Sequence, residues 1–206
     1  MSKLETNTID NISGSSTLTI GDSNASTISI PKNITLGASG TTITVPAGAT
    51  ITNNGTQTGF GGTNTPAFEA YLSSNQSISS SSATKVQFNT EVLDTDGCYD
   101  NSTNYRFTPT VAGNYLINVM LGCNGGGGST LTSSYAHIYK NGSLYIENHL
   151  NVQNTSIFYH TPVTSAIINF NGSTDYVEAY GTITTSGSPS FQSGTYSRFW
   201  GFKIIE

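Results

Sequence analysis

Lys85–Val119, with the sequence KVQFNTEVLDTDGCYDNSTNYRFTPTVAGNYLINV, carries the densest set of structural signals in the 206-residue chain. From Tyr115 to Leu121 every second residue is apolar, which is the period of a strand with one buried side. Pro109 lacks a backbone donor and therefore suits the end of a strand, while Gly113 permits a turn into the next strand. The stretch predicts short strands joined by tight turns.

Two later segments carry the same kind of signal. Asn141-Gly142 lies between the alternating runs HIYK and SLYI, and Asn-Gly suits a type I′ hairpin because both central residues of that turn need positive φ. The last segment, Phe199–Ile205 (FWGFKII), has apolar side chains on both faces. A strand of this kind must be covered on both sides.

In this order, the segments resemble the globular head of complement component C1q, which belongs with the tumour-necrosis-factor-like jelly rolls. The motifs behind the resemblance are a Gly97–Asp100 corner, a Phe107–Pro109 hinge, Gly-x-Tyr at 113–115, the Lys140–Gly142 hairpin and Phe-x-Gly-Phe at 199–202, within a match from Pro66 to Ile205. The resemblance implies an all-β jelly-roll β-sandwich, a homotrimer and a binding role rather than a catalytic one. It places the final strand at the threefold axis, with the interface residues Phe199, Trp200, Phe202 and Ile204.

The first sixty residues differ from the rest. Short apolar pairs such as Leu18/Ile20 and Ile28/Ile30 alternate with Gly, Ser, Asn and Thr turns. Two apolar side chains cannot offset about 1–2 kcal/mol of backbone entropy per ordered residue, so burial must come from neighbouring chains or a docking surface. A partly disordered polar tail is the alternative. We expect an extended β-repeat attachment segment at 1–62, a hinge at Gly55–Gly62 and a jelly-roll head at 63–206. The residues assigned to attachment are Leu4, Ile9, Ile12, Leu18, Ile20, Ile28 and Ile30.

The irregular repeat resembles the shafts and attachment segments of phage fibres. Joined to a head of this type, it resembles small virion proteins of tailed bacteriophages, particularly marine ones. The resemblance implies a non-enzymatic protein on the surface of the virion. Two functions fit: a trimeric short fibre or decoration (cement) protein docked on the capsid or tail, and a receptor-binding adhesin that recognises a host surface glycan. The length of 206 residues favours decoration, since fibres that reach a receptor are commonly far longer.

Composition excludes several other classes. Charged residues make up 9% of the chain against a usual figure of about 25%, and the net charge is −5. Seven Lys and Arg without a basic cluster make nucleic acid an unfavourable partner. The chain shows no apolar run near 18 residues and no N-terminal secretion signal, which predicts a soluble protein without membrane insertion. The sequence indicates no cofactor.

Groups that could bind a metal are few. Asp94, Asp96 and Asp100 suggest a calcium site, although the glycine comes early for a calcium loop and a solvated turn is the better interpretation. Cys98 and Cys123 fit buried thiols better than a disulfide framework, and a single bridge between them stays open. We expect no metal site among the three histidines, because they lack zinc-ligand spacing.

Strand order predicts where a ligand would bind. Eight strands are expected at Phe68–Leu72, Tyr105–Thr108, Tyr115–Leu121, Tyr135–Lys140, Ser143–Asn148, Val163–Phe170, Tyr176–Ile183 and Arg198–Ile205. Antiparallel order then puts three short turns at the end where the chain enters and three long connections at the far end. Long loops on a rigid scaffold commonly hold binding sites. The candidate ligand residues are Phe158, Tyr159, His160, Phe191, Gln192 and Tyr196, and the alternative is that they pack at the apex of a trimer.

Overall fold

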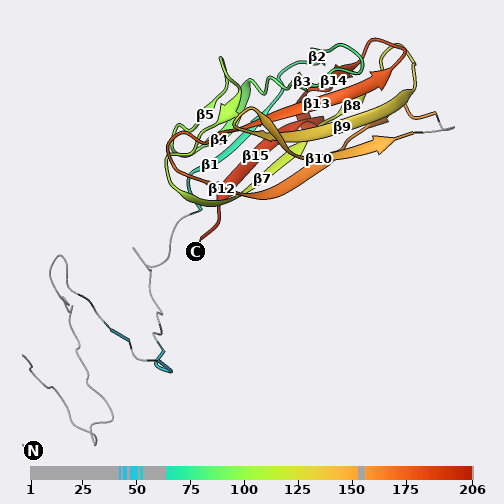
Figure 1. Ribbon diagram of the computed structural model, residues 1–206. Helices are drawn as coiled ribbons and strands as arrows, with labels where there is room; N and C mark the ends of the chain where they lie inside the picture. Colours follow the sequence, from blue (N-terminus) through green and yellow to red (C-terminus); the bar gives the residue numbers. More distant parts are fainter. Residues whose placement is uncertain are drawn as a thin grey trace, which may run out of the picture. The chain divides into compact units, whose positions relative to one another are not determined.

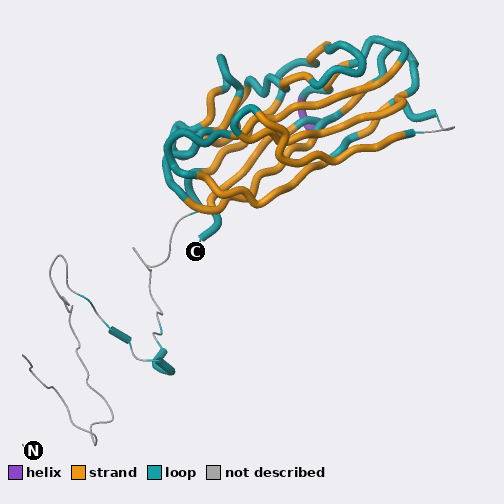
Figure 2. Tube along the Cα trace, in the orientation of Figure 1, coloured by secondary structure: helices purple, strands orange, loops and turns teal. Residues whose placement is uncertain are grey.

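The computed structural model describes residues 64–152 and 156–205, together with residues 42, 44–45, 47–50 and 52. The chain divides into two units, Met1–Thr56 and Gln57–Glu206, and every strand of the described residues belongs to the second. The described residues of this unit are mainly β-strand, with one short 3-10 helix, η1 (Gly194–Tyr196) (Figure 2). In the described part of the chain, no helix is long and apolar enough to cross a membrane. The predicted boundary at 62/63 stays a prediction.

The strands form two large antiparallel sheets and one small one (Figure 1). The five-stranded sheet has the order β12 (Val163–Phe170), β7 (Gly113–Met120), β15 (Arg198–Lys203), β1 (Ala67–Tyr71) and β4 (Thr90–Asp94). The six-stranded sheet has the order β10 (Ser143–Asn151), β9 (Leu131–Lys140), β13 (Val177–Thr185), β6 (Arg106–Phe107) and β5 (Tyr99–Asp100), with β3 (Thr84–Lys85) also paired to β13. The four-stranded sheet consists of β11 (Tyr159–His160), β8 (Cys123–Asn124), β14 (Ser190–Phe191) and β2 (Gln76–Ser77).

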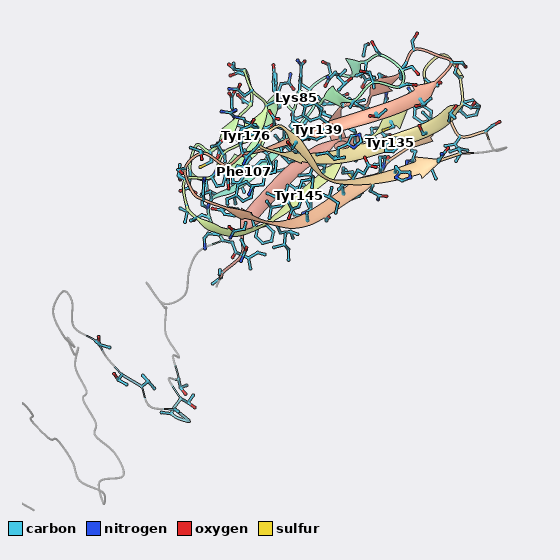
Figure 3. All side chains as sticks on the ribbon, viewed as in Figure 1. Lys85, Phe107, Tyr135, Tyr139, Tyr145 and Tyr176 are labelled. Carbon is cyan, nitrogen blue, oxygen red and sulfur yellow. The ribbon has the colours of Figure 1, made fainter. Side chains whose placement is uncertain are left out.

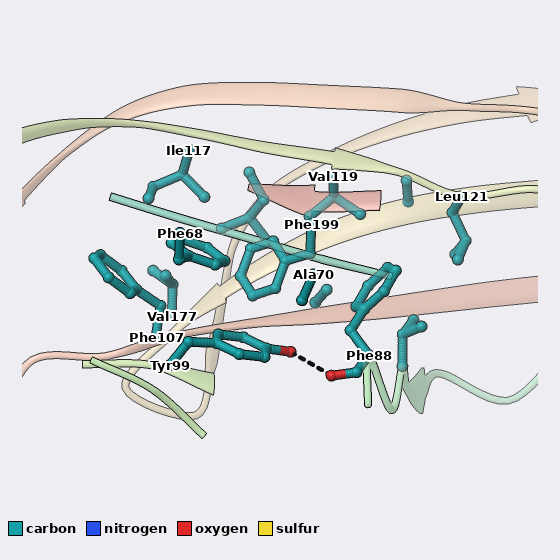
Figure 4. Packing of buried hydrophobic residues seen from close by; sticks show 14 of the residues in the cluster. Phe68, Ala70, Phe88, Tyr99, Phe107, Ile117, Val119, Leu121, Val177 and Phe199 are labelled. Carbon is teal, nitrogen blue, oxygen red and sulfur yellow. Dashed lines mark hydrogen bonds between the residues drawn. The ribbon is translucent and has the colours of Figure 1, made fainter. Parts of the chain in front are cut away.

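The core lies between the two large sheets and is built around aromatic rings (Figure 4). Phe68 on β1 stacks on Phe107 with ring centroids 4.2 Å apart and on Tyr99 at 5.1 Å. Phe199 meets Phe68 edge-on at 4.8 Å. The Tyr99 hydroxyl donates to the carbonyl of Phe88 at 3.0 Å, so its polar end is satisfied inside the core. Side chains alternate between the two faces along β7, and this alternation places Tyr115, Ile117 and Val119 in the same core.

The Asn-Gly hairpin is confirmed. Asn141 and Gly142 connect β9 to β10 with φ values of 51° and 78°, as a type I′ turn requires. The Asn141 side chain also accepts from the Tyr176 N–H at 2.9 Å and donates to Asp175 at 2.8 Å. This turn is therefore tied to the connection between β12 and β13.

The two ends of the sandwich differ as predicted. The connections β6–β7, β9–β10 and β12–β13 are short and lie at the end where the chain enters β1, which we call the short-turn end (Figure 1). The connections β7–β9, β10–β12 and β13–β15 lie at the opposite end, which we call the long-connection end, and contact one another. The Gly125 N–H donates to the carbonyl of Phe158 at 3.1 Å, and the Gln192 N–H donates to the carbonyl of Gly122 at 2.7 Å.

Both cysteines are buried free thiols, so the open question of a Cys98–Cys123 bridge is answered against it. Cys98 lies between β4 and β5, and Cys123 lies in β8. Burial raises the pKa of the Cys123 thiol to about 12, so that it stays protonated and unreactive at neutral pH.

Candidate functional site

A cavity of about 330 Å³ lies at the long-connection end. It is lined by Tyr159, His160 and Thr161 from the β10–β12 connection, by Gly122 and Cys123 from β7–β9, and by Gln192 and Tyr196 from β13–β15. The three connections are brought together by β8, which pairs with β11 on one side and with β14 on the other. The four-stranded sheet therefore builds this site from residues far apart in the sequence.

Gly122 sets the spacing between two of these connections. Its N–H donates to the Ser197 hydroxyl at 3.0 Å, and its carbonyl accepts from the Gln192 N–H at 2.7 Å. A Cβ on Gly122 would lie 2.7 Å from the Tyr196 Cβ and 3.0 Å from the Gln192 Cβ. Any side chain at this position would push the β13–β15 connection away from the cavity.

The polar groups around the cavity are partly held in place. His160 Nδ1 lies 2.7 Å from the hydroxyl of Ser134, and burial lowers the pKa of this imidazole, which favours its neutral form. The Gln192 Nε2 donates to the Ser190 hydroxyl at 3.0 Å, and among the described residues no donor is bonded to its Oε1. The cavity therefore combines an ordered carboxamide with a neutral imidazole.

Four of the six predicted ligand residues line the cavity: Tyr159, His160, Gln192 and Tyr196. Phe158 is 42% exposed beside them but does not line it. Phe191 was predicted wrongly, because its pairing with Cys123 turns the ring inward, where its exposed fraction is 0%. Gly122, Cys123 and Thr161 were missed, since the sequence around them carries no pattern that indicates a site.

The predicted interface residues divide between the two faces of β15. Phe199 was assigned wrongly, because its side chain is fully buried in the core of its own chain and cannot contact another copy. Trp200, Phe202 and Ile204 are half-buried, and the first two rings stack on the opposite side of the strand. The predicted attachment residues Leu4, Ile9, Ile12, Leu18, Ile20, Ile28 and Ile30 lie outside the described residues.

The three aspartates proposed for calcium organise turns. Asp94 accepts from the N–H groups of Cys98 and Tyr99, each at 3.0 Å. Asp100 accepts from the backbone N–H groups of residues 102–104 at 2.9–3.0 Å and from the Asn104 side chain at 2.7 Å. Asp96 accepts from the Thr95 hydroxyl. In residues 64–152 and 156–205, no three His, Cys, Asp or Glu side chains gather as a metal site would need.

Removing the Asp100 carboxylate is expected to destabilise the head in a pH-dependent way. Backbone N–H groups of Thr103 and Ser102 hold the pKa of Asp100 well below its usual range. Its stabilisation is therefore complete above the unfolded pKa of about 4 and disappears as pH falls through the lower folded pKa. We expect Asp100→Ala to lower the free energy of unfolding by about 1 kcal/mol at pH 7, measured by urea denaturation.

The matched control is Asp96→Ala, since that carboxylate accepts one hydroxyl bond and caps no backbone N–H among the described residues. It should change stability by a few tenths of a kcal/mol at most, as is usual for surface changes. A difference between wild type and Asp100→Ala that stays constant from pH 7 to pH 3 would contradict the role given to Asp100.

A second polar surface covers the outside of the six-stranded sheet, where Tyr135, Tyr139 and Tyr176 lie in a row (Figure 3). Tyr139 stacks on Tyr180 with centroids 4.2 Å apart. Tyr135 stacks between His137 and His149, at 5.6 and 4.8 Å.

Charged groups hold the rings of this row. Arg106 lies 4.3 Å from the centre of the Tyr176 ring. Lys85, which lies over Tyr180, forms an ion pair with the buried Glu178 at 2.5 Å. Because these rings already stack on neighbouring rings or lie against cationic side chains, the row supports the sheet and leaves the cavity as the better candidate for a ligand site.

Comparison with solved structures agrees with the predicted fold. The chain is similar to murine APRIL at pH 5.0, with 9% identity and a TM-score of 0.50 over 67% of this chain and 98% of that one. It is also similar to Eiger TNF from S. frugiperda, with 9% identity and a TM-score of 0.51 over 67% and 90%. The globular domain of zebrafish complement 1qA gives 18% identity and a TM-score of 0.48 over 68% and 96%. No protein-family model and no curated protein matches the sequence. The tumour-necrosis-factor-like jelly roll is thus confirmed as a fold.

Proposed function

We propose that this chain, with its jelly-roll head of the tumour-necrosis-factor type, is a non-enzymatic structural protein of a bacteriophage virion. It forms a homotrimeric short fibre or decoration protein, in which segment 1–62 docks on the capsid or tail and the head is exposed. The observation that carries the trimer is a face of the five-stranded sheet on which the apolar side chains are exposed or half-buried among the described residues. The virion assignment is supported by the short β-repeat sequence of segment 1–62.

This face is formed by β12, β7 and β15. Strand register sets its side chains in cross-strand rows: Ile167, Leu116 and Phe202; Ser165, Asn118 and Trp200; Val163, Met120 and Arg198. Ile167 is 62% exposed, although it lies in the middle of a strand. Val163 on the same strand is 47% exposed, and exposed apolar side chains that gather on one sheet face are typical of a protein contact. We call these nine residues the outer face.

Asn118 gives the outer face a polar centre. Its side chain is buried beneath its neighbours, and its Oδ1 accepts from the Ser165 hydroxyl. Its Nδ2 has no partner among the described residues. Because a buried donor without an acceptor costs about 1–3 kcal/mol, an acceptor from another copy would stabilise the assembled state.

A complementary apolar surface lies along the edge strand β10. Its residues Leu144, Tyr145 and Ile146 are exposed, and a register shift lies between Leu144 and Ile146. An exposed edge strand with apolar side chains promotes aggregation unless another part of the protein or another copy covers it. If this edge of one copy packs on the outer face of the next, the contact joins two different surfaces. Such a contact forms a closed ring where the rotation between copies is 120°, and a ring of three agrees with the expected threefold axis.

A receptor-binding adhesin is the second candidate. The cavity between Tyr159 and Tyr196 favours it, because exposed aromatic side chains and polar groups converge at the end opposite the entry of the chain. A decoration protein needs only its docking segment and its trimer, whereas an adhesin also needs such a site.

Two chain lengths test the proposal. Light scattering on the full chain should give the mass of three 21.7 kDa copies, and a chain that begins at Thr63 should also fold and form a trimer. Only the full chain should attach to virions lacking this protein, because attachment is assigned to segment 1–62. Occupancy is measured by cryo-electron microscopy of the particles.

The two outcomes are separable. If light scattering gives a monomer at micromolar concentration, the proposed trimer is wrong. If the chain that begins at Thr63 reaches normal occupancy on the particles, the docking role proposed for segment 1–62 is wrong, even if the trimer forms.

A further inference from the structure

The size of the cavity at the long-connection end limits what it can hold. Its volume of about 330 Å³ lies at the lower end of the range of about 300–1,000 Å³ found for small-molecule sites. A single small ring with its substituents fits such a volume, whereas an extended peptide needs a longer groove. The site therefore suits one terminal group of a larger ligand.

The two tyrosines that line the cavity are unusually open to solvent. Tyr159 is 66% exposed and Tyr196 is 61% exposed, and they come from different connections. An exposed tyrosine presents an apolar ring and a hydroxyl that stays wet. Two such rings beside one cavity favour a ligand that has an apolar C–H surface together with many hydroxyl groups.

The polar groups of the site favour hydroxyl ligands. Gln192 is oriented by its bond to Ser190, which leaves its Oε1 as an acceptor. Thr161, which is exposed, adds a hydroxyl that can donate or accept. The carboxamide and the hydroxyl are both uncharged, and each can form hydrogen bonds with the hydroxyl groups of a neutral ligand.

Charge narrows the ligand class further. None of the seven lining residues is Asp, Glu, Lys or Arg. Burial also lowers the pKa of His160 and so favours its neutral form. A charged ligand group would lose its water here without gaining a counter-ion, which is costly.

We propose that this cavity binds a neutral hexose unit, with Tyr159 and Tyr196 against the sugar ring and Gln192 accepting from its hydroxyl groups. The proposal rests on the adhesin candidate of the proposed function and names its ligand class. It requires that the cavity stays open in the trimer, so that three copies present three equivalent sites.

The test is sugar binding by the full chain in solution. Saturation-transfer NMR is recorded with methyl α-D-glucoside, methyl β-D-galactoside and N-acetylglucosamine, and with N-acetylneuraminic acid as an anionic sugar. At least one neutral sugar should show transfer and saturable binding, and the anionic sugar should show none. Tyr159→Ala and Gln192→Ala should each weaken binding about tenfold or more, and Tyr159→Phe should keep most of it.

Phe158→Ala is the matched control, because Phe158 is an exposed aromatic next to Tyr159 that does not line the cavity. It should bind the sugar as the wild type does. Light scattering and thermal unfolding accompany each variant, and loss of the trimer in Tyr159→Ala would show that the tyrosine packs between copies and would overturn the proposal. Absence of transfer from every neutral sugar to a trimeric wild type would also overturn it. A monomeric wild type that still binds sugar would contradict the trimer alone.

Discussion

Gly201→Val is expected to prevent stable folding of the jelly-roll head. Gly201 lies in β15, between Ile117 of β7 and Phe68 of β1. A Cβ at this position would lie 2.7 Å from the carbonyl oxygen of Leu116, 2.6 Å from the Ile117 Cδ1 and 3.1 Å from the Phe68 ring. The carbonyl belongs to a ladder in the middle of the sheet and cannot move without breaking pairing.

The size of this effect follows from ordinary stabilities. Inserting atoms into a filled core costs about 1–3 kcal/mol, and a clash with backbone raises that figure. Domains are stable by about 5–15 kcal/mol, so Gly201→Val should remove at least a large part of the total. We expect an insoluble product or a thermal midpoint lower by more than about 10 °C, measured by circular dichroism.

Two further variants make the result specific. Gly201→Ala should be destabilised less than Gly201→Val, because only the Cβ clash remains. Ser143→Val adds the same side chain at an exposed position at the start of β10 and should leave stability nearly unchanged. A Gly201→Val head with the wild-type midpoint would mean that β15 does not pass between β7 and β1.

Phe202→Glu is expected to dissociate the proposed trimer and leave each head folded. The Phe202 side chain lies on the outer face and stacks on Trp200 at 6.5 Å, outside the core that holds Phe199. In a single chain the new carboxylate can therefore stay in water. In the trimer it would be buried against another copy without a partner, which costs several kcal/mol at each of three equivalent contacts.

Light scattering at micromolar concentration should thus give one chain's mass for Phe202→Glu. Val111→Glu is the matched control, because Val111 is 44% exposed in the short β6–β7 connection and lies off the outer face. It should remain a trimer. Equal behaviour of the two variants would show that the outer face is not where the copies meet. Loss of circular dichroism in Phe202→Glu would show that the side chain supports the fold of its own chain.

Long-range strand order could be predicted because each long strand carries its own pattern. All eight predicted strands are present as β1, β6, β7, β9, β10, β12, β13 and β15, with β12 at its predicted bounds and the other seven with one or both ends shifted. The remaining strands, β2, β3, β4, β5, β8, β11 and β14, were not among them. All of these except β4 contain only two residues, and two positions cannot establish a period. They exist because a longer neighbour or another connection offers backbone partners.

The candidate site divides in the same way. Antiparallel order sends the three long connections to one end, and for that reason Tyr159, His160, Gln192 and Tyr196 could be predicted to lie together. The alternation of inward and outward side chains along a strand could not decide whether Phe191 points outward, because the sequence does not predict a strand there. The two-residue strand β14 is defined only by its pairing with short neighbouring strands such as β8. The pairing with β8 also brings Gly122 and Cys123 into the cavity wall.

By itself, the sequence determined the all-β class, the Asn141-Gly142 hairpin, the buried face of β7 and the end at which the long connections gather. Each follows from local periods and backbone preferences that act over a few residues. Tertiary structure alone decided that Phe199 and Phe191 belong to the core, that Gly122 has no room for a side chain, and that three connections enclose one cavity. These features depend on register and close packing between segments far apart in the chain, such as β1 and β15, and no local pattern specifies such contacts.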